Sequence, residues 1–133
     1  AIEHPDSINK KFSTPKYTTV DRQHFDLMAE AMNQVMKAGT GAYSNIDSLN
    51  ICGKTGTVQN PHGADHSIFI AFAPKDDPKI AISVIIENAG FGATWAGPVA
   101  SLMIERYLTG KVNREWYEKR ILDANLMNVA PKK

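Results

Sequence analysis

Apolar residues recur at helical spacing between Asp21 and Gly39, and they predict an amphipathic helix. Five of them share one face: Phe25, Met28, Met32, Val35 and Met36. Asp21 can cap the start of this helix, and Gly39 and Gly41 mark its end. A stripe rich in methionine could also form an adaptable binding groove, but packing in a core is the favoured interpretation.

The middle of the chain carries the alternating pattern of β-strands, which we predict at 51–59, 67–73 and 79–87. Turn signals separate them at 60–63 and at 74–78, where prolines and polar residues gather. The second and third strands have apolar residues on both faces, so the sheet should be covered on both sides. We expect one antiparallel sheet in chain order, with the first strand at its edge.

Two further helices are predicted after the flexible loop at 90–92. The first runs from about residue 95 or 97 to 108, with Pro98 in its first turn and Gly110 beyond its end. Asn113 can cap the second, which carries Trp116, Tyr117, Arg120 and Ile121. The two aromatic residues could form a partner surface, but packing on the sheet is the favoured interpretation.

The order helix, three strands, helix, helix predicts an α+β fold, an antiparallel sheet flanked by helices. With 133 residues, the chain is long enough for one modest domain. Residues 1–20 are polar and aperiodic, which predicts an extended or loop segment. We expect the folded unit at 21–123 and a tail at 124–133.

Composition and charge exclude several classes of protein. Hydrophobic residues make up 43% and charged residues 22%, as in ordinary soluble domains. A net charge of +1 gives no electrostatic case for nucleic-acid binding. No apolar run is long enough to span a bilayer, and no signal peptide is visible. The chain begins at Ala1, which indicates a processed chain or a piece of a longer one, and Cys52 has no intrachain disulfide partner.

The first predicted strand contains the polar run Lys54-Thr55-Gly56-Thr57, which is unusual for a strand interior. An ammonium and a hydroxyl on one strand edge can hold a carboxylate. Gly56 would leave room for a second backbone, and the edge offers N–H and C=O groups to an extended peptide. The run therefore predicts a site for a peptide with a free carboxylate, although a polar edge strand that resists aggregation is an alternative.

Other ligand sites fit the sequence less well. A phosphate-binding P-loop needs a glycine where Ser48 stands. Zinc could be imagined on Cys52, His62, Asp65 and His66. Both histidines would need a helix between them, whereas 60–63 predicts a loop, so no metal and no cofactor is expected. The loop at 90–92 precedes a helix and could hold an anion, but a turn is favoured.

The run 54–59, Lys-Thr-Gly-Thr-Val-Gln, resembles the third motif of penicillin-binding proteins and is typical of the class B transpeptidases. Residues 69–74 resemble the next strand of that domain. Residues 80–88, with the glycines at 90 and 92, resemble its last strand and the loop into its C-terminal helix. The resemblance is clear from about Phe25 to Leu108 and is strongest to the elongation transpeptidases.

The resemblance implies two further motifs, a Ser-x-x-Lys that supplies the nucleophile and a Ser-x-Asn. Residues 13–16 match the first in letters, but no apolar helical pattern follows them. Residues 7–9 and 48–50 match the second, but 7–9 is aperiodic and 48–50 enters the same strand as Lys54. We therefore expect one wall of an active site without its nucleophile, inactive alone.

The family's roles carry over to the matching residues. Lys54 would supply positive potential and assist proton transfer, and the Thr55 and Thr57 hydroxyls would bind a carboxylate beside Gly56. The Thr57 backbone N–H would be an oxyanion donor. The implied enzyme is a serine-type D-Ala-D-Ala transpeptidase of peptidoglycan synthesis. A β-lactam sensor of the same fold and a non-catalytic binding module are the alternatives.

Implied partners are stem peptides ending in D-Ala-D-Ala, β-lactam antibiotics, the rest of the transpeptidase domain, and membrane proteins of the elongation machinery. No nucleic acid is expected. The family resemblance also implies an inner-membrane protein whose catalytic domain faces the periplasm.

Overall fold

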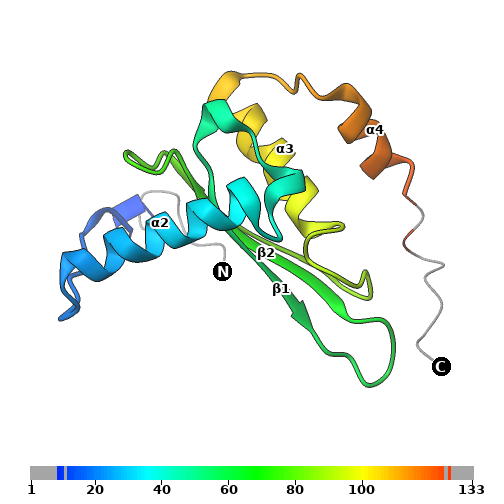
Figure 1. Ribbon diagram of the computed structural model, residues 1–133, viewed down its shortest axis with the longest axis horizontal. Helices are drawn as coiled ribbons and strands as arrows, with labels where there is room; N and C mark the ends of the chain where they lie inside the picture. Colours follow the sequence, from blue (N-terminus) through cyan, green and yellow to red (C-terminus); the bar gives the residue numbers. More distant parts are fainter. Residues whose placement is uncertain (1–8, 11, 125, 127–133) are drawn as a thin grey trace.

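The computed structural model describes residues 9–10, 12–124 and 126, which contain a three-stranded antiparallel sheet and helices, so the predicted α+β fold is confirmed (Figure 1). The helices are α2 (Arg22–Ala38), α3 (Ala96–Thr109) and α4 (Glu115–Leu122), and the strands are β1 (Cys52–Val58), β2 (His66–Ala73) and β3 (Ile80–Ile86). Two short 3-10 turns that the sequence did not predict, η1 (Ala42–Ser44) and η2 (Asp47–Leu49), connect α2 to β1.

Helix α2 begins directly after Asp21 and ends before Gly39, as predicted. The Asp21 side chain makes no capping hydrogen bond. Its backbone carbonyl instead accepts a bond from the His24 N–H at 3.1 Å. Of the methionine stripe, Met36 is fully buried, whereas Phe25 and Met28 are 52% and 59% exposed. Among the described residues, the core therefore contains Met36 of this stripe, while Met32 and Val35 are half-buried.

The sequence predicted an extended or loop segment before α2, but part of this segment is helical. Residues 9–10 and 12–13 are helical, and the backbone from residue 15 to 18 is irregular. The Ser13 hydroxyl donates to the Lys10 carbonyl at 3.1 Å and closes a single turn. One turn buries too little apolar surface to create the helical periodicity that would reveal it. Residues 1–8 lie outside the described residues.

The strands pair in the order β1-β2-β3, with both pairs antiparallel, as predicted. Their ends lie within one residue of the predicted ones. Lys54 is opposite Ile70, and Ile70 is opposite Ser83. Strand β1 is an edge of the described sheet, with β2 as its one hydrogen-bonded neighbour strand among the described residues.

Helix α3 covers one face of the sheet and forms the core with it. Phe69 is fully buried between the sheet and the fully buried residues Ala96, Ala100 and Ile104 of this helix. Removing a buried phenylalanine side chain costs about 3–5 kcal/mol. As predicted, Pro98 lies in the first turn of α3 and Gly110 ends it, with a left-handed φ of 80°.

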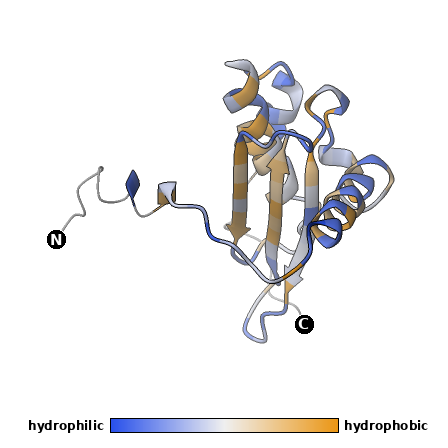
Figure 2. Ribbon diagram, turned by 90° about the vertical axis from the view of Figure 1, so that its left-hand side faces the viewer, coloured by the Kyte–Doolittle hydropathy of each residue, from blue (hydrophilic) through white to orange (hydrophobic). Residues whose placement is uncertain are grey.

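The sequence predicted that both faces of the sheet are covered, but the face opposite α3 is largely exposed. Ile70 is 46% exposed and Ile85 is 62% exposed, and their paired neighbours place both side chains on this face. In the face-on view of the sheet, α2 lies beside β1 rather than across the strands (Figure 2). The apolar pattern was correct, but the described residues provide no layer to bury it.

Helix α4 begins after Arg114, so the prediction that Asn113 caps it is wrong. The Asn113 side-chain amide and backbone N–H instead donate to Glu105 Oε1, at 3.3 and 3.1 Å. Tyr117 is fully buried, but it packs against η1, where its hydroxyl donates to the Tyr43 carbonyl, and not on the sheet as predicted. Trp116 is 61% exposed.

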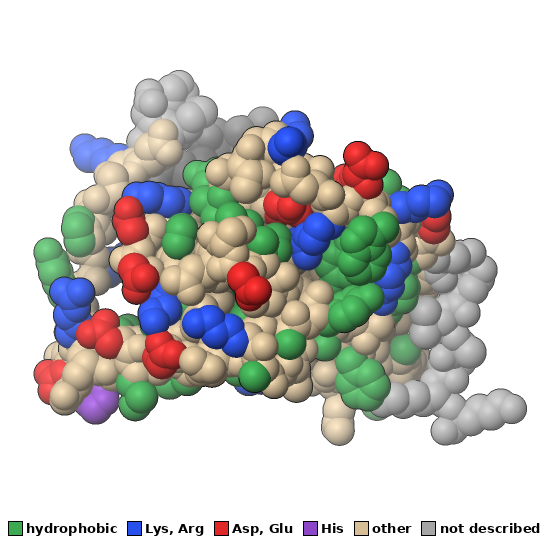
Figure 3. Space-filling view, turned by 45° about the horizontal axis from the view of Figure 1, so that its top comes forward, with side chains coloured by type: hydrophobic (Ala, Val, Ile, Leu, Met, Phe, Trp, Pro, Cys, Tyr) green, Lys and Arg blue, Asp and Glu red, His purple; other side chains and the backbone are tan. Residues whose placement is uncertain are grey.

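The described surface gives two further findings. None of the described helices combines the length and the apolar character needed to cross a membrane. On the face shown in Figure 3, Lys and Arg side chains are interspersed with Asp and Glu. Charges of both signs on one face match the small net charge of +1.

Candidate active site

A pocket of about 280 Å³ lies where the end of α2, strand β1 and the loop before α3 meet. It is lined by Thr40, Thr55, Gly56, Thr57, Phe91, Gly92 and Ala93. The polar run that the sequence singled out thus contributes three of its four residues to one concave site. Two of those residues carry hydroxyl groups, so the pocket can donate hydrogen bonds to an anion.

The alternation of β1 explains why both threonines reach this pocket. Side chains two residues apart on a strand lie on the same face, so Thr55 and Thr57 share one side of the sheet. This is the face covered by α3, because Thr55 is opposite Phe69 and Thr57 is opposite Ser67. The hydroxyls therefore converge where α3 begins.

Lys54 is exposed and is not among the residues that line the pocket. Its ammonium donates a hydrogen bond to the Thr55 backbone carbonyl at 2.7 Å. Alternation places the Lys54 side chain on the other face of the sheet from Thr55 and Thr57, so its ammonium lies outside the pocket in this structure. Its flexible four-carbon stem can carry the charge elsewhere when a better acceptor is present.

Thr40 is a site residue that the sequence did not reveal. Its hydroxyl oxygen lies 2.7 Å from that of Thr55, across the pocket wall. Gly39 and Gly41 flank it, and the sequence interpreted those glycines only as the end of a helix. A threonine isolated between two glycines was the available signal.

The backbone of Gly56 is closely approached by the loop before α3, but the glycine that this approach requires is Gly92 of the loop rather than Gly56. A Cβ on Gly56 would lie 3.4 Å from the Ile68 Cβ, an ordinary contact. A Cβ on Gly92 would lie 2.4 Å from the Gly56 carbonyl oxygen and 2.2 Å from that of Ile68. Gly92 is therefore the residue whose missing side chain lets the loop reach β1.

Hydrogen bonds hold the loop before α3 against β2. The Ser67 hydroxyl donates to the Phe91 carbonyl at 3.0 Å and accepts from the Ala96 N–H at 3.0 Å. The Gly97 N–H donates to the Gly92 carbonyl at 2.9 Å. One buried serine thus joins the pocket wall, the sheet and the first turn of α3.

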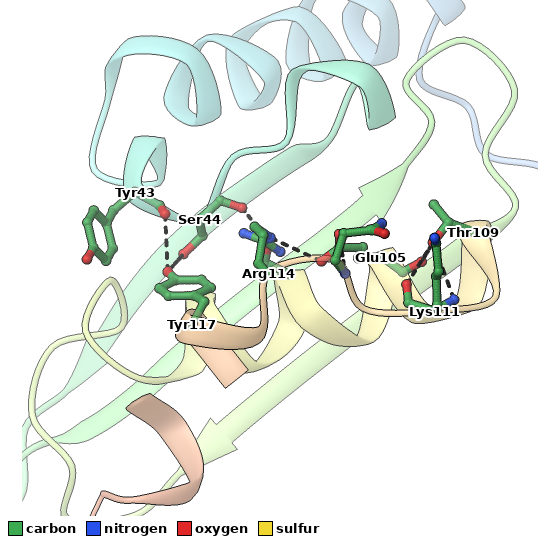
Figure 4. A network of polar contacts seen from close by, with 9 residues as sticks. Tyr43, Ser44, Glu105, Thr109, Lys111, Arg114 and Tyr117 are labelled. Carbon is green, nitrogen blue, oxygen red and sulfur yellow. Dashed lines mark hydrogen bonds and ion pairs between the residues drawn. The ribbon is translucent and has the colours of Figure 1, made fainter. Parts of the chain in front are cut away.

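A buried polar network holds the wall that carries Thr40 (Figure 4). Arg114 donates to Glu105 Oε2 at 3.0 Å and to the Ser101 hydroxyl at 2.8 Å. The Ser101 hydroxyl donates in turn to the Ser44 carbonyl of η1. Since η1 begins two residues after Thr40, the network ties this wall to α3 and α4.

The same network accommodates two titratable groups in the protein interior. Burial acts to raise the pKa of Glu105, but hydrogen bonds from the Asn113 N–H and the Arg114 side chain outweigh it, and the net pKa is lowered. Burial raises the pKa of Tyr117, whose hydroxyl donates to the Tyr43 carbonyl at 3.1 Å. Glu105 is therefore ionised and Tyr117 is neutral at pH 7.

The alternative Ser motifs do not line the pocket. Ser13 ends its helical turn, and Lys16 lies in irregular backbone, so the pair has no helical face in common. Ser48 lies in η2, and the Asn50 side chain accepts a bond from Asn33 at 3.0 Å. Ser7 lies outside the described residues.

The other candidate ligand sites are not assembled. Within 9–10, 12–124 and 126, no three His, Cys, Asp or Glu side chains are grouped as metal ligands. Cys52 is buried, which raises its pKa, and its thiol donates to the Ala29 carbonyl at 3.2 Å. Gly53 and Lys54 lie inside β1, so a P-loop reading of them is wrong.

Comparison with known protein families adds independent information. Residues 2–105 match the family described as the penicillin binding protein transpeptidase domain. The match includes α2, all three strands and most of α3. Its span therefore contains the whole candidate pocket.

Individual relatives carry related names. Peptidoglycan D,D-transpeptidase MrdA of Haemophilus influenzae is 36% identical over an alignment of 90 residues, and the match covers 56% of this chain and 14% of that protein. MrdA of Acinetobacter baumannii is 36% identical over an alignment of 101 residues, and the match covers 65% of this chain and 15% of that protein. The chain thus corresponds to about one seventh of the length of these curated relatives.

Solved structures agree with the fold. Pseudomonas aeruginosa PBP2 in complex with WCK 5153 matches with a TM-score of 0.63 and 33% identity, over 77% of this chain and 23% of that one. Penicillin-binding protein A from M. tuberculosis, a ceftriaxone acyl-enzyme complex, matches with a TM-score of 0.60 and 31% identity. That match covers 72% of this chain and 24% of the other.

Proposed function

This chain belongs to the penicillin-binding protein transpeptidase family, and we propose that it is the C-terminal part of the catalytic domain of a class B peptidoglycan D,D-transpeptidase. Residues 21–123 form that part, preceded by the segment 1–20 and followed by the tail 124–133. The observation that carries the proposal is the pocket in which the Thr55 and Thr57 hydroxyls converge. It lies on the strand that carries the family's third motif.

The pocket binds the free carboxylate of a stem peptide that ends in D-Ala-D-Ala. Thr55 and Thr57 each donate one hydroxyl hydrogen bond to it, and a charged acceptor makes these bonds shorter and stronger. The outer edge of β1 pairs with the extended peptide through backbone groups. The carboxylate and the scissile carbonyl are thereby held in fixed positions along one strand.

Acyl transfer then follows the family's serine chemistry. A serine hydroxyl from a part of the enzyme outside this chain attacks the carbonyl of the penultimate D-Ala, and its proton passes to the departing D-Ala amine. An ester joins the serine to the shortened peptide until the amine of a second stem peptide attacks it and regenerates the serine. The Thr57 N–H stabilises the oxyanion, an interaction that contributes about 3 kcal/mol in other acyl-transfer enzymes.

Lys54 supplies the positive charge at this edge. Its ammonium bonds the Thr55 carbonyl in the free chain, 2.7 Å away, and moves toward the substrate and the Ser-x-Asn serine when the cleft is complete. A lysine is suited to this movement because its ammonium is a point charge on a flexible stem. The charge attracts the carboxylate and assists proton transfer.

The same wall accepts β-lactam antibiotics, which carry a carboxylate beside a reactive carbonyl. The M. tuberculosis relative is an acyl-enzyme complex with ceftriaxone. In our proposal, a penicillin places its carboxylate on Thr55 and Thr57 and acylates the same serine. Acylation by penicillin is therefore a direct measure of this site.

The exposed apolar face of the sheet supports a larger domain. Ile70 is 46% exposed and Ile85 is 62% exposed, and we assign the rest of the transpeptidase domain as the layer that buries them. Because peptidoglycan lies outside the cytoplasmic membrane, we place this domain in the periplasm of an inner-membrane protein. Its further partners are membrane proteins of the elongation machinery.

The test is acylation of the full-length protein from the same reading frame by a fluorescent penicillin. Thr55→Val keeps the side-chain shape and removes one hydroxyl, so acylation should slow by about ten- to a hundredfold. An unchanged rate would contradict the proposal. Cross-linking of stem peptides separates a transpeptidase from a β-lactam sensor, which would be acylated without forming cross-links.

A further inference from the structure

We propose that Thr40 is a positioning residue that orients the Thr55 hydroxyl toward the substrate carboxylate. The inference rests on the proposed function of Thr55, and it assigns a role to a residue outside the Lys-Thr-Gly run. Its basis is the 2.7 Å separation of the two hydroxyl oxygens and their shared place in the pocket wall.

The hydrogen bond between the Thr40 and Thr55 hydroxyls can have either of two directions. Each hydroxyl has one proton to donate, so at this distance one hydroxyl donates to the other. If Thr55 donates to Thr40, its proton is not available to a ligand. If Thr40 donates to Thr55, the Thr55 proton is free to point into the pocket, and a carboxylate, which can only accept, selects this second arrangement.

Thr40 can have this role because its backbone is firmly held. The N–H groups of Gly39 and Gly41 both donate to the Val35 carbonyl at 3.1 Å. A Cβ on Gly39 would lie 2.9 Å from the Val35 Cα, and one on Gly41 would lie 2.6 Å from the Met36 sulfur. Both glycines thus pack against the last turn of α2, which leaves Thr40 as the single side chain that this turn can present to the pocket.

The proposed arrangement also strengthens the bond to the ligand. A hydroxyl that accepts one hydrogen bond becomes a better donor in the next, so the order Thr40 to Thr55 to carboxylate is cooperative. Without Thr40, the Thr55 hydroxyl is free to rotate and loses this polarisation. We expect Thr40→Val to slow acylation of the full-length protein by about three- to tenfold, less than Thr55→Val.

The experiment measures second-order acylation rates with a penicillin and with its methyl ester, which has no carboxylate. Thr40→Val should slow the reaction with penicillin and leave the reaction with the ester nearly unchanged. Thr40→Ser restores the hydroxyl and should recover most of the rate. Since Thr40 is exposed, its variants should melt at the wild-type temperature. If Thr40→Val nevertheless folds poorly, Thr40→Ala removes the same hydroxyl and leaves a smaller side chain.

The double variant gives the sharpest distinction. If Thr40 acts through Thr55, Thr40→Val should add little to the loss in Thr55→Val, because the hydroxyl that it orients is already absent. Additive losses, or equal slowing with penicillin and its ester, would overturn the positioning role. A wild-type rate for Thr40→Val beside a slow Thr55→Val would overturn this inference alone, whereas wild-type rates for both would overturn the proposed function as well.

Discussion

Gly92 and Gly56 are packed backbone to backbone, so that a Cβ on Gly92 would lie 2.4 Å from the Gly56 carbonyl oxygen. The contact joins the loop before α3 to the strand that carries the candidate site. The atoms that a Cβ on Gly92 would meet are the backbone carbonyl oxygens of Gly56 and Ile68. Because these are not the ends of flexible side chains, the backbone itself would have to move to make room for a methyl group. The width of the pocket therefore depends on a glycine outside the Lys-Thr-Gly run.

We predict that Gly92→Ala lowers penicillin acylation of the full-length protein at least tenfold and destabilises it by about 1–3 kcal/mol, as overpacking does. Gly110→Ala is the matched control. Its backbone has a φ of 80°, so alanine should cost about 1 kcal/mol there, but Gly110 lies at the far end of α3. The control should melt lower and acylate normally, and equal acylation by both variants would contradict the account.

Lys54→Ala should slow acylation more than Thr55→Val does. The lysine change removes a full charge from carboxylate binding and from proton transfer, whereas the threonine change removes one hydrogen bond of about 1.5–3 kcal/mol. Both side chains are at an edge with little packing to lose, so the melting temperatures should stay close to wild type. A Lys54→Ala rate at or above that of Thr55→Val would contradict this ranking, and a wild-type rate would show that the charge has no role in acylation.

Arg114→Ala should destabilise the fold strongly. Glu105 and Arg114 form an ion pair at 3.0 Å, with side chains only 5% and 20% exposed. Removing the arginine leaves a buried carboxylate without its cation, which costs about 3–5 kcal/mol. The matched control is Lys119→Ala, which breaks the ion pair between Lys119 and Asp123. These two side chains are 76% and 63% exposed. Urea unfolding should place the control within about 0.5 kcal/mol of wild type.

The lowered pKa of Glu105 predicts a pH dependence of stability. A carboxyl group with a lowered pKa in the folded state stabilises the fold above its unfolded pKa, which is about 4.3. This contribution is lost as the pH falls through the folded pKa. The difference in unfolding free energy between wild type and Glu105→Gln should therefore shrink below about pH 5. A difference that stays constant down to pH 3 would contradict the assignment.

Local pattern was sufficient for most of the fold. The spacing of apolar residues located the three strands, and Pro98 and Gly110 marked the ends of α3, because these signals act over a few residues. Asn113 was misassigned because its polar atoms bond Glu105, eight residues earlier on another helix, rather than its own helix start. Burial of Ile70 and Ile85 could not be predicted locally either, since it depends on what covers the sheet.

The candidate site was predicted only in part, for a similar reason. Strand alternation places Thr55 and Thr57 on one face, and this follows from the sequence alone. Thr40 reaches Thr55 across fifteen residues, through a turn whose shape depends on packing against α2. The backbone approach was anticipated at Gly56, but the residue that requires it is Gly92.

The most direct test of the account is a crystal structure of the full-length protein acylated by a penicillin. The account predicts a covalent ester on a serine outside this chain, with the penicillin carboxylate bonded to the Thr55 and Thr57 hydroxyls. The ester carbonyl oxygen should lie about 2.7–3.1 Å from the Thr57 backbone nitrogen. A carboxylate bound away from these threonines, or an adduct that does not contact β1, would contradict the claim that residues 54–57 form the substrate-binding wall.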